Sequence, residues 1–374
     1  MGFYVCEIGT AGAAIKELIV KAITDLGLNM DDCRGQCYDG AGNMAGRLNG
    51  VSSLIKQTHE KAIFVHCMNH RLNLCIADTC SLPVVRNMMT VVRKLSEFFS
   101  NSPKRQQCLL SKIKELLPDN NHYVLIDVCR TRWISRIDGM DRIVELLEPV
   151  VSLLEDITMN RDITVNVDGA TIGNWNISSR NDAQSLLNAI NFSFIVSIVI
   201  VSYILRLTKP LTVKLQRKEI DLLKAKDEIA LLKSELTEMQ TNIDLKHHEL
   251  YMEAVNLANK VSLEPSMPRI VQRQAHRANA AATTPEQYYK INLTRVFLDH
   301  CLQQLNSRFQ DEINLCYKGL SIIPSVLLEH SLVWKQNVKD FCHHYRQDIP
   351  NIVGLDAELQ LFGTNVASAA GGRS

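Results

Sequence analysis

The chain of 374 residues carries 41 lysines and arginines against 40 aspartates and glutamates, so its formal net charge is only +1. This balance excludes binding to nucleic acid through a global positive field, and any such contact must come from local basic patches. The eleven cysteines are odd in number and scattered, which favours a reduced intracellular protein over a disulfide framework. No secretory signal pattern opens the chain, and we expect a nuclear or cytoplasmic location.

The first part of the chain alternates predicted strands with predicted helices. In chain order these are a strand over residues 3–8, a helix over 13–26, a strand ending at Tyr38, a helix over 44–59, a strand over 62–65 and a helix from residue 66. This order is typical of a parallel α/β unit. It places Asp39 at the carboxyl end of a strand, where open α/β sheets hold their chemistry.

Beyond residue 80 the sequence predicts mostly helices. They cover residues 83–99, 103–117, 131–157 and 189–205 and begin again at Thr284, with an extended stretch at 122–128 and a polar loop at 160–180. The apolar run at 189–205 reaches only the lower limit of a membrane span and is interrupted by Asn191 and three serines. It predicts a buried bundle helix, and we expect no contact with a membrane.

A leucine or isoleucine recurs every seven residues from Leu215 to Leu257. The companion stripe is weaker, because lysine and glutamate occupy several of its positions. One strong seam beside a patchy one favours a long helix that lies against a bundle, with a two-stranded coiled coil as the alternative. The residues from 363 to 374 are small or polar and predict a disordered tail.

Asp39 has two interpretations. An aspartate before Gly-Ala is a common turn former, because its carboxylate accepts hydrogen bonds from nearby backbone N–H groups. The other interpretation is a metal ligand, but one carboxylate cannot hold two divalent ions. The residues alone favour the turn.

A zinc site is the second candidate. Cys67, His70, Cys75 and Cys80 follow a spacing close to that of a zinc knuckle. The intervening sequence contains no glycine and reads as a helix, on which His70, Cys75 and Cys80 would point in three directions. We therefore favour cysteines that act as small core residues.

Two basic segments are candidate DNA contacts. Arg132, Trp133 and Arg136 combine guanidinium groups, which suit phosphates, with an indole, which suits a splayed base. The alternative is a helix start whose tryptophan packs inward. The second segment is a basic helical edge formed by Arg269, Arg273 and Arg277. It would track a phosphate backbone or be a solvated face. His247 and His248 lie on a charged stretch and are predicted to be solvated.

Several separated motifs resemble the core of hAT-superfamily transposases, in the transposase-derived group of zinc finger MYM-type protein 1-like proteins. They are residues 34–44 (RGQCYDGAGNM), 65–74 (VHCMNHRLNL), 102–105 (SPKR), 131–133 (TRW) and 284–289 (TPEQYY). The likeness runs from about residue 2 to residue 361.

The resemblance implies an RNase H-like fold with a large helical insertion, and metal-dependent DNA strand cleavage by two aspartates and a glutamate. Asp39 corresponds to the second aspartate. Cys67 and His70 correspond to the Cys-x2-His element of the family, and Trp133 to a tryptophan that stacks on a flipped base.

The chain also departs from the family pattern. It is expected to begin at the third strand of the fold, after the strand that bears the first aspartate. The likeness stops near Glu358, which does not match the motif of the family's glutamate or its dimerisation region. Without the first strand, residues 3–8 would either bridge a gap of about 10 Å or pair directly with the strand that bears Asp39.

We therefore predict an α-rich α/β protein with a truncated RNase H-like sheet and a large all-α helical insertion. The predicted boundaries are a partial RNase H-like domain at 1–130, a helical region at 131–362 and the tail at 363–374. The predicted function is that of a transposase-derived protein without catalysis that retains DNA binding. One alternative is an active transposase completed in trans or by missing exons, and another is a helical interaction scaffold without a DNA role.

The cofactor and partner predictions follow from this choice. The inactive protein needs no cofactor, whereas an active one would bind Mg²⁺ or Mn²⁺ through Asp39. The expected partners are DNA and a homo- or hetero-oligomer that forms without the dimerisation region of the family.

Overall fold

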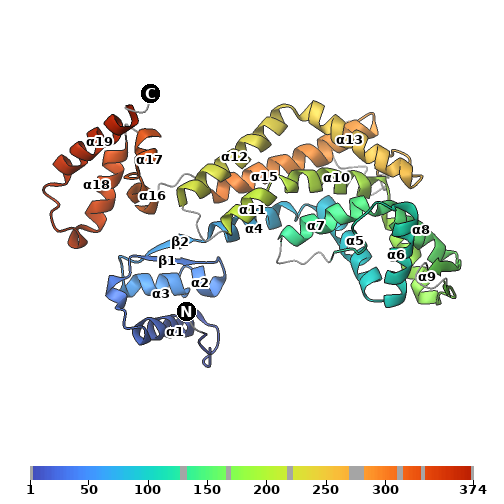
Figure 1. The fold of residues 1–374 in the computed structure, drawn as a ribbon, viewed down its shortest axis with the longest axis horizontal. Coiled ribbons are helices and arrows are strands. Elements are labelled where there is room, and N and C mark those ends of the chain that lie inside the picture. Colours follow the sequence, from blue (N-terminus) through green and yellow to red (C-terminus); the bar gives the residue numbers. More distant parts are fainter. Residues whose placement is uncertain are drawn as a thin grey trace, which may run out of the picture. The chain divides into compact units, whose positions relative to one another are not determined.

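The computed structural model describes residues 3–126, 133–165, 170–216, 222–268, 282–309, 315–329 and 333–371. Helices dominate these residues and strands are few (Figure 1). Clustering of the backbone gives two compact units. The first comprises residues 1–72, 217–227 and 309–374, and the second comprises residues 73–216 and 228–308. The boundaries between the units fall after residues 72, 216, 227 and 308, and the predicted division at residue 130 stays a prediction.

The first unit is a small parallel sheet with helices. Its elements are α1 (Gly12–Asp25), η1 (Met30–Asp32), β1 (Gly35–Tyr38), α2 (Gly42–Ala45), α3 (Val51–Thr58), β2 (Ile63–His66), α16 (Leu315–Leu320), α17 (Pro324–Glu329), α18 (Trp334–His344), η4 (Arg346–Asp348) and α19 (Leu355–Gly371). Two further helices, α4 (Met68–Thr79) and α12 (Leu222–Thr241), run from one unit into the other.

The two strands of the first unit pair in parallel, as the order of elements predicted. Gly35 lies opposite Ile63 and Tyr38 opposite His66. A core forms between this sheet, α1 and α3, because the apolar stripe of α1 packs on buried Val51 and Ile55. Helix α1 ends at Asp25, and Gly27 closes it as predicted, with a φ of +72° that is strained for any residue with a side chain.

The strand predicted at residues 3–8 is absent. These residues form no strand, and the side chains of Val5 and Ile8 are 78% and 79% exposed. Both predicted pairings of this segment, across a gap or directly with β1, are therefore wrong in this structure. The residue types of this short segment favour a strand, but a strand forms only where a neighbouring backbone supplies hydrogen bonds.

The helix predicted over residues 44–59 is broken into α2 and α3. Gly46 and Gly50 lie so close that a Cβ on Gly50 would stand 2.3 Å from the backbone nitrogen of Gly46. This contact requires glycine and forms a turn between the two helices. The periodic pattern did not reveal it, because glycine is compatible with both outcomes.

The carboxyl-terminal helices of the first unit have their own core. Trp334, Val338, Leu327 and Leu359 are buried together. The predicted disordered tail is instead helical to residue 371, and residues 372–374 lie outside the described part. The reason is an apolar stripe that continues beyond the expected end, since the side chains of α19 that pack in this core are Leu355, Leu359, Phe362 and Val366.

The second unit is helical with one short hairpin. Its elements are α5 (Pro83–Ser100), α6 (Pro103–Leu116), α7 (Trp133–Glu145), α8 (Leu147–Thr158), β3 (Ile163–Val165), β4 (Ala170–Ile172), α9 (Ile177–Ala189), α10 (Phe192–Arg206), α11 (Lys209–Leu215), α13 (Ile243–Lys260), α14 (Pro285–Tyr289), the π-helical turn η3 (Lys290–Arg295) and α15 (Val296–Arg308).

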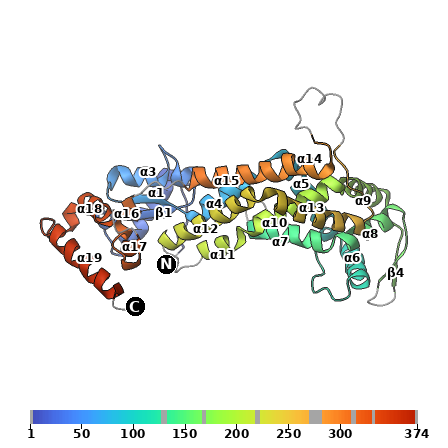
Figure 2. The ribbon, with the colours of Figure 1, turned by 90° about the horizontal axis from the view of Figure 1, so that it is seen from above.

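Helix α10 is the centre of the second unit. It packs against α13, α7 and α5 (Figures 1 and 2). Twelve of its fifteen residues are buried. The stretch from Phe192 to Leu215 is apolar and long enough to cross a membrane by length and composition, and 72% of its most apolar window is buried. This burial is what a core helix shows, as the sequence predicted.

The heptad pattern begins with Leu215 at the end of α11, and its other positions lie on α12 and α13, which the structure separates at Asn242. Ile229, Leu236, Ile243 and Leu250 of the strong seam are all buried. The prediction of helix packed against a bundle is confirmed, although one long helix has become two.

Two other predictions for the second unit were wrong in part. The helix predicted over 131–157 is α7 followed by α8, because Pro149 has no N–H to donate to the carbonyl of Glu145. The predicted loop at 160–180 contains the antiparallel pair β3–β4, with buried Ile163 and Val165, and the start of α9. Residues 122–126 of the predicted extended stretch form no strand, and residues 127 and 128 lie outside the described part.

His247 is buried rather than solvated as predicted. Its side chain is fully buried, Nε2 lies 3.0 Å from the carbonyl oxygen of Glu286, and Nδ1 lies 2.8 Å from the hydroxyl of Thr294. Because a carbonyl only accepts, Nε2 carries the proton and Nδ1 accepts from Thr294. Burial lowers the pKa of His247, against a smaller opposing effect of Glu286. His248 next to it is exposed and pairs with Glu286 as expected of a solvated residue.

We expect acid to destabilise the second unit through His247. Between pH 7 and pH 5 the unfolded histidine, with a pKa of about 6.5, binds a proton that the buried one does not, so the free energy of unfolding falls as the pH falls. His247→Gln should cost about 1–3 kcal/mol at pH 7 and flatten this pH dependence. Urea unfolding at several pH values measures both effects.

The matched control is His248→Gln, which changes the exposed neighbour and should alter the free energy of unfolding at pH 7 by less than about 1 kcal/mol. An unaltered slope in His247→Gln would contradict the assignment.

Candidate functional site

The carboxyl end of the β1–β2 sheet brings together the residues that the sequence singled out first. Asp39 follows β1 directly, and His66 is the last residue of β2, opposite Tyr38. The N–H of Cys67 donates to the carbonyl of Tyr38 at 3.0 Å and extends the ladder by one bond. Because both strands run the same way, the two chain segments leave the sheet at the same edge.

Gly40 packs closely against two histidine rings at this edge, because it has no Cβ. A Cβ on Gly40 would stand 2.7 Å from Cε1 and 2.9 Å from Nε2 of His66, and 3.0 Å from Cδ2 of His70. The two imidazole rings stack with centroids 6.0 Å apart and an angle of 22° between their planes. The turn after Asp39 therefore packs directly on a histidine pair.

The charge state of His66 is set mainly by burial. Desolvation lowers the pKa of His66, and the positive charges of Arg71 and His70 lower it further. The backbone of Cys67 and the carboxylate of Asp39 act in the opposite direction but do not overcome the effect of burial. His66 is therefore neutral at pH 7.

Asp39 itself is exposed and forms a turn. Its Oδ1 accepts a hydrogen bond from the N–H of Ala41 at 3.2 Å, just before α2. This is the turn-forming contact that the residues alone favoured. In the part of the chain that the structure describes, no three histidine, cysteine, aspartate or glutamate side chains are placed to hold a metal ion. The described residues thus do not fit a two-metal centre, and the metal role of Asp39 stays a prediction.

The knuckle-like spacing lies on a helix. Residues 68–79 form α4, so the spacing does not bend into a knuckle. Cys75 and Cys80 are buried core residues, and burial raises the pKa of Cys80 to about 12. Both thiols are therefore protonated at neutral pH, as expected of core cysteines. Cys67 and His70 lie at the start of α4 and are half-buried, and a DNA contact by either stays a prediction.

The predicted DNA-binding arginines are only partly within the described residues. Helix α7 begins at Trp133, but Arg132 and the side chain of Trp133 lie outside them. Arg136 is half-buried, and its charge lowers the pKa of Cys80 slightly against the effect of burial. The second predicted set also lies outside the described residues, namely Arg269, Arg273 and Arg277.

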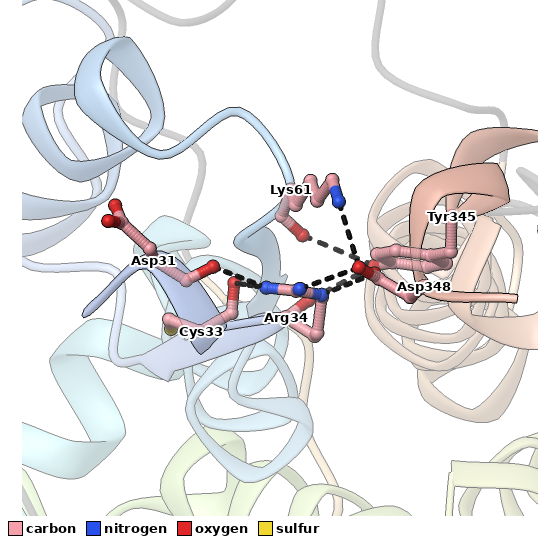
Figure 3. Close-up of polar contacts among 6 residues, drawn as sticks. All are labelled: Asp31, Cys33, Arg34, Lys61, Tyr345 and Asp348. Carbon is pink, nitrogen blue, oxygen red and sulfur yellow. Dashed lines mark hydrogen bonds and ion pairs between the residues drawn. The ribbon is translucent and has the colours of Figure 1, made fainter. Parts of the chain in front are cut away.

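Two groups of residues escaped the sequence reasoning. The first is His66 with Gly40, which the register of the strands would have revealed, since His66 lies opposite the residue before Asp39. The second is at the other end of the sheet, where Arg34 and Lys61 meet Asp348 (Figure 3). No local signal marks this contact.

Comparison with known proteins agrees with the resemblance seen in the motifs. Residues 5–50 match the ZMYM1/FAM200 RNase-like domain family. The chain is 29% identical over 337 residues to the human 52 kDa repressor of the inhibitor of the protein kinase, and 28% identical over 336 residues to the mouse protein. These alignments cover 89% of this chain and 43% of each relative, so the chain spans less than half the length of either. No solved structure matches the chain.

Gly40→Ala should disrupt the carboxyl edge of the sheet. The added methyl group overlaps His66 and must displace a half-buried ring, at a cost of about 1–3 kcal/mol in the free energy of unfolding. Urea unfolding measures this cost, and NMR shifts of the His66 ring report the displacement.

Gly42→Ala is the matched control, because a Cβ at that position meets nothing within 4 Å and Gly42 lies inside α2. Equal effects of the two substitutions would argue against the packing of Gly40 on His66.

Proposed function

We propose that this chain, a relative of transposase-derived proteins with a ZMYM1/FAM200-type RNase-like domain, binds DNA without cutting it. The proposal assigns β1 and β2 to an RNase H-like sheet and the second unit to the helical insertion of that fold. One observation supports this assignment: the first unit consists of residues 1–72, 217–227 and 309–374, so the two segments of the helical second unit, 73–216 and 228–308, interrupt it in sequence.

The absence of cleavage is inferred from the geometry around Asp39. Two-metal cleavage of DNA needs several carboxylates that bridge two ions about 4 Å apart. Among the described residues, the carboxyl edge of the sheet offers Asp39 beside two imidazoles and no cluster able to hold a metal ion. The one carboxylate is exposed and engaged in a turn. We therefore derive no catalytic step from this edge.

DNA binding is inferred from the start of α7. Backbone N–H groups at a helix amino terminus attract phosphates, and arginines beside them add charge. Helix α7 begins at Trp133, with Arg132 before it and Arg136 one turn later. We propose that these residues contact DNA, and that the protein acts in the nucleus.

Cleavage is tested with purified protein, transposon-end DNA and Mn²⁺. We expect no more nicking by the wild-type protein than by Asp39→Ala, because a single carboxylate does not hold two ions. Metal-dependent nicking that disappears in Asp39→Ala would overturn the proposal in favour of an active transposase. Asp39→Ala should lower the free energy of unfolding by no more than about 1 kcal/mol, because the exposed side chain loses the turn hydrogen bond from Ala41, and urea unfolding checks that both proteins are folded.

DNA binding is tested with Arg132→Ala and Trp133→Ala. The loss of one stacked base should weaken binding by about 1–3 kcal/mol, or roughly 5- to 150-fold. The loss of one phosphate contact should reduce the slope of log K against log salt by about 0.9. Fluorescence anisotropy with a labelled duplex at several salt concentrations measures both.

Arg93→Ala is the control, because it removes the same charge from an exposed ion pair on α5. Binding that is absent, or that survives both substitutions, would favour the helical interaction scaffold.

A further inference from the structure

The amino end of the β1–β2 sheet carries two cations. Arg34 immediately precedes β1, and Lys61 lies two residues before the start of β2. Because the strands are parallel, both residues emerge at the same edge, opposite the edge that holds Asp39 and His66. This edge is therefore separate from the candidate site described above.

Both cations bind one carboxylate from the other end of the chain (Figure 3). Arg34 contacts Asp348 with two nitrogens, Nε to Oδ2 at 2.6 Å and Nη2 to Oδ1 at 2.8 Å. Lys61 Nζ lies 2.9 Å from Oδ1. These two contacts hold the pKa of Asp348 at about 2, so this carboxylate is ionised throughout the neutral range. Asp348 therefore occupies the edge as an anion.

The cationic edge is organised by contacts that do not involve the carboxylate. Arg34 Nη1 donates to the carbonyl of Asp31 at 2.6 Å, and this hydrogen bond fixes the orientation of the guanidinium group. The Arg34 and Lys61 carbonyls both lie within reach of the Tyr345 hydroxyl, at 3.1 Å and 3.2 Å. The hydroxyl has one proton, so the two carbonyls share it. The arrangement of Arg34 thus does not depend on Asp348 alone.

An arginine fork with a lysine beside it is a combination that recognises phosphate as well as carboxylate. The side chains of Arg34, Lys61 and Asp348 are 35%, 28% and 31% exposed, so a ligand in solution reaches them. Ion pairs this exposed are weak and are screened by salt. The carboxylate of Asp348 can therefore be exchanged for another anion without loss of a buried pair.

We propose that Arg34 and Lys61 form a binding site for a phosphate of the DNA backbone, and that Asp348 covers this site in the structure. The carboxylate of Asp348 then competes with DNA, so that DNA binding releases Asp348 from Arg34 and Lys61, while the hydrogen bonds of Tyr345 to the two carbonyls remain. This inference rests on the proposed DNA binding and adds a second contact surface to it.

The test measures the affinity for a labelled duplex at several salt concentrations. Asp348→Asn should bind the duplex about five- to tenfold more tightly at low salt than the wild-type protein. The slope of log K against log salt should steepen by about 1–2, since each neutralised phosphate contributes about 0.9. Adding Arg34→Ala and Lys61→Ala to Asp348→Asn should abolish both changes.

The matched control is Asp356→Asn. It produces the same change in net charge in the same carboxyl-terminal segment and releases Lys339 from an exposed ion pair, but no arginine fork. We expect less than a twofold change in affinity. An equal gain in the two variants, or a gain that survives the loss of Arg34 and Lys61, overturns the proposal.

A second test uses the wild-type protein alone, so its result does not depend on whether the variants fold. Saturating duplex should accelerate hydrogen exchange in residues 345–349 and leave α15 unchanged. Unchanged exchange at 345–349 contradicts the competition. If inorganic phosphate at millimolar concentration produces the same acceleration as the duplex, the site takes free phosphate and the assignment to DNA is wrong.

The outcomes separate this inference from the proposed function. Wild-type binding to DNA with no effect of Asp348→Asn removes only the site at Arg34 and Lys61. If neither protein binds the duplex, the proposed DNA binding fails and this site fails with it.

Discussion

The parallel pairing of β1 with β2 is the constraint on which both ends of the first unit depend. Four residues of each strand align, and the register sets which side chains leave the sheet at each end. A slip by one residue would move Tyr38 from the face that packs on the α1–α3 core to the opposite face. It would also separate the turn after Asp39 from His66.

The two edges of this sheet differ in charge. At the carboxyl edge, burial keeps His66 neutral, and a glycine allows the turn to lie against the ring. At the amino edge, Arg34 and Lys61 remain charged and reach solvent, with Asp348 between them. A carboxylate at the first edge has imidazoles as neighbours, whereas a carboxylate at the second edge has cations. The amino edge is therefore the better anion site of the two.

In the second unit, one apolar helix organises the packing. Helix α10 is buried around its circumference, so its neighbours must be amphipathic, and α13 packs against it with Tyr251 edge-on to Phe192. His247 lies on that helix and is buried with both ring nitrogens hydrogen-bonded. Its partner Thr294 belongs to a π-helical turn, a local irregularity that places the hydroxyl against the ring.

The sequence by itself determined the local structure and the kinship of this protein. Capping residues such as Ser102 and Thr284 begin helices where expected, because their side chains satisfy the free N–H groups of the first turn. The succession of β1 and β2 and the burial of α10 follow from local residue patterns, and the transposase-like motifs are short segments that agree in order along the chain.

Tertiary structure alone decided the contacts between distant segments. Asp348 lies 314 residues from Arg34 and 287 from Lys61, and no local pattern states which anion a surface cation meets. The burial of His247 and the helix at residues 363–371 likewise depend on neighbours far along the chain. The strand expected at residues 3–8 is missing because a strand needs a partner. The spacing of apolar residues shows which face of a segment is apolar. Strand pairing and burial depend instead on which distant segments pack against that face.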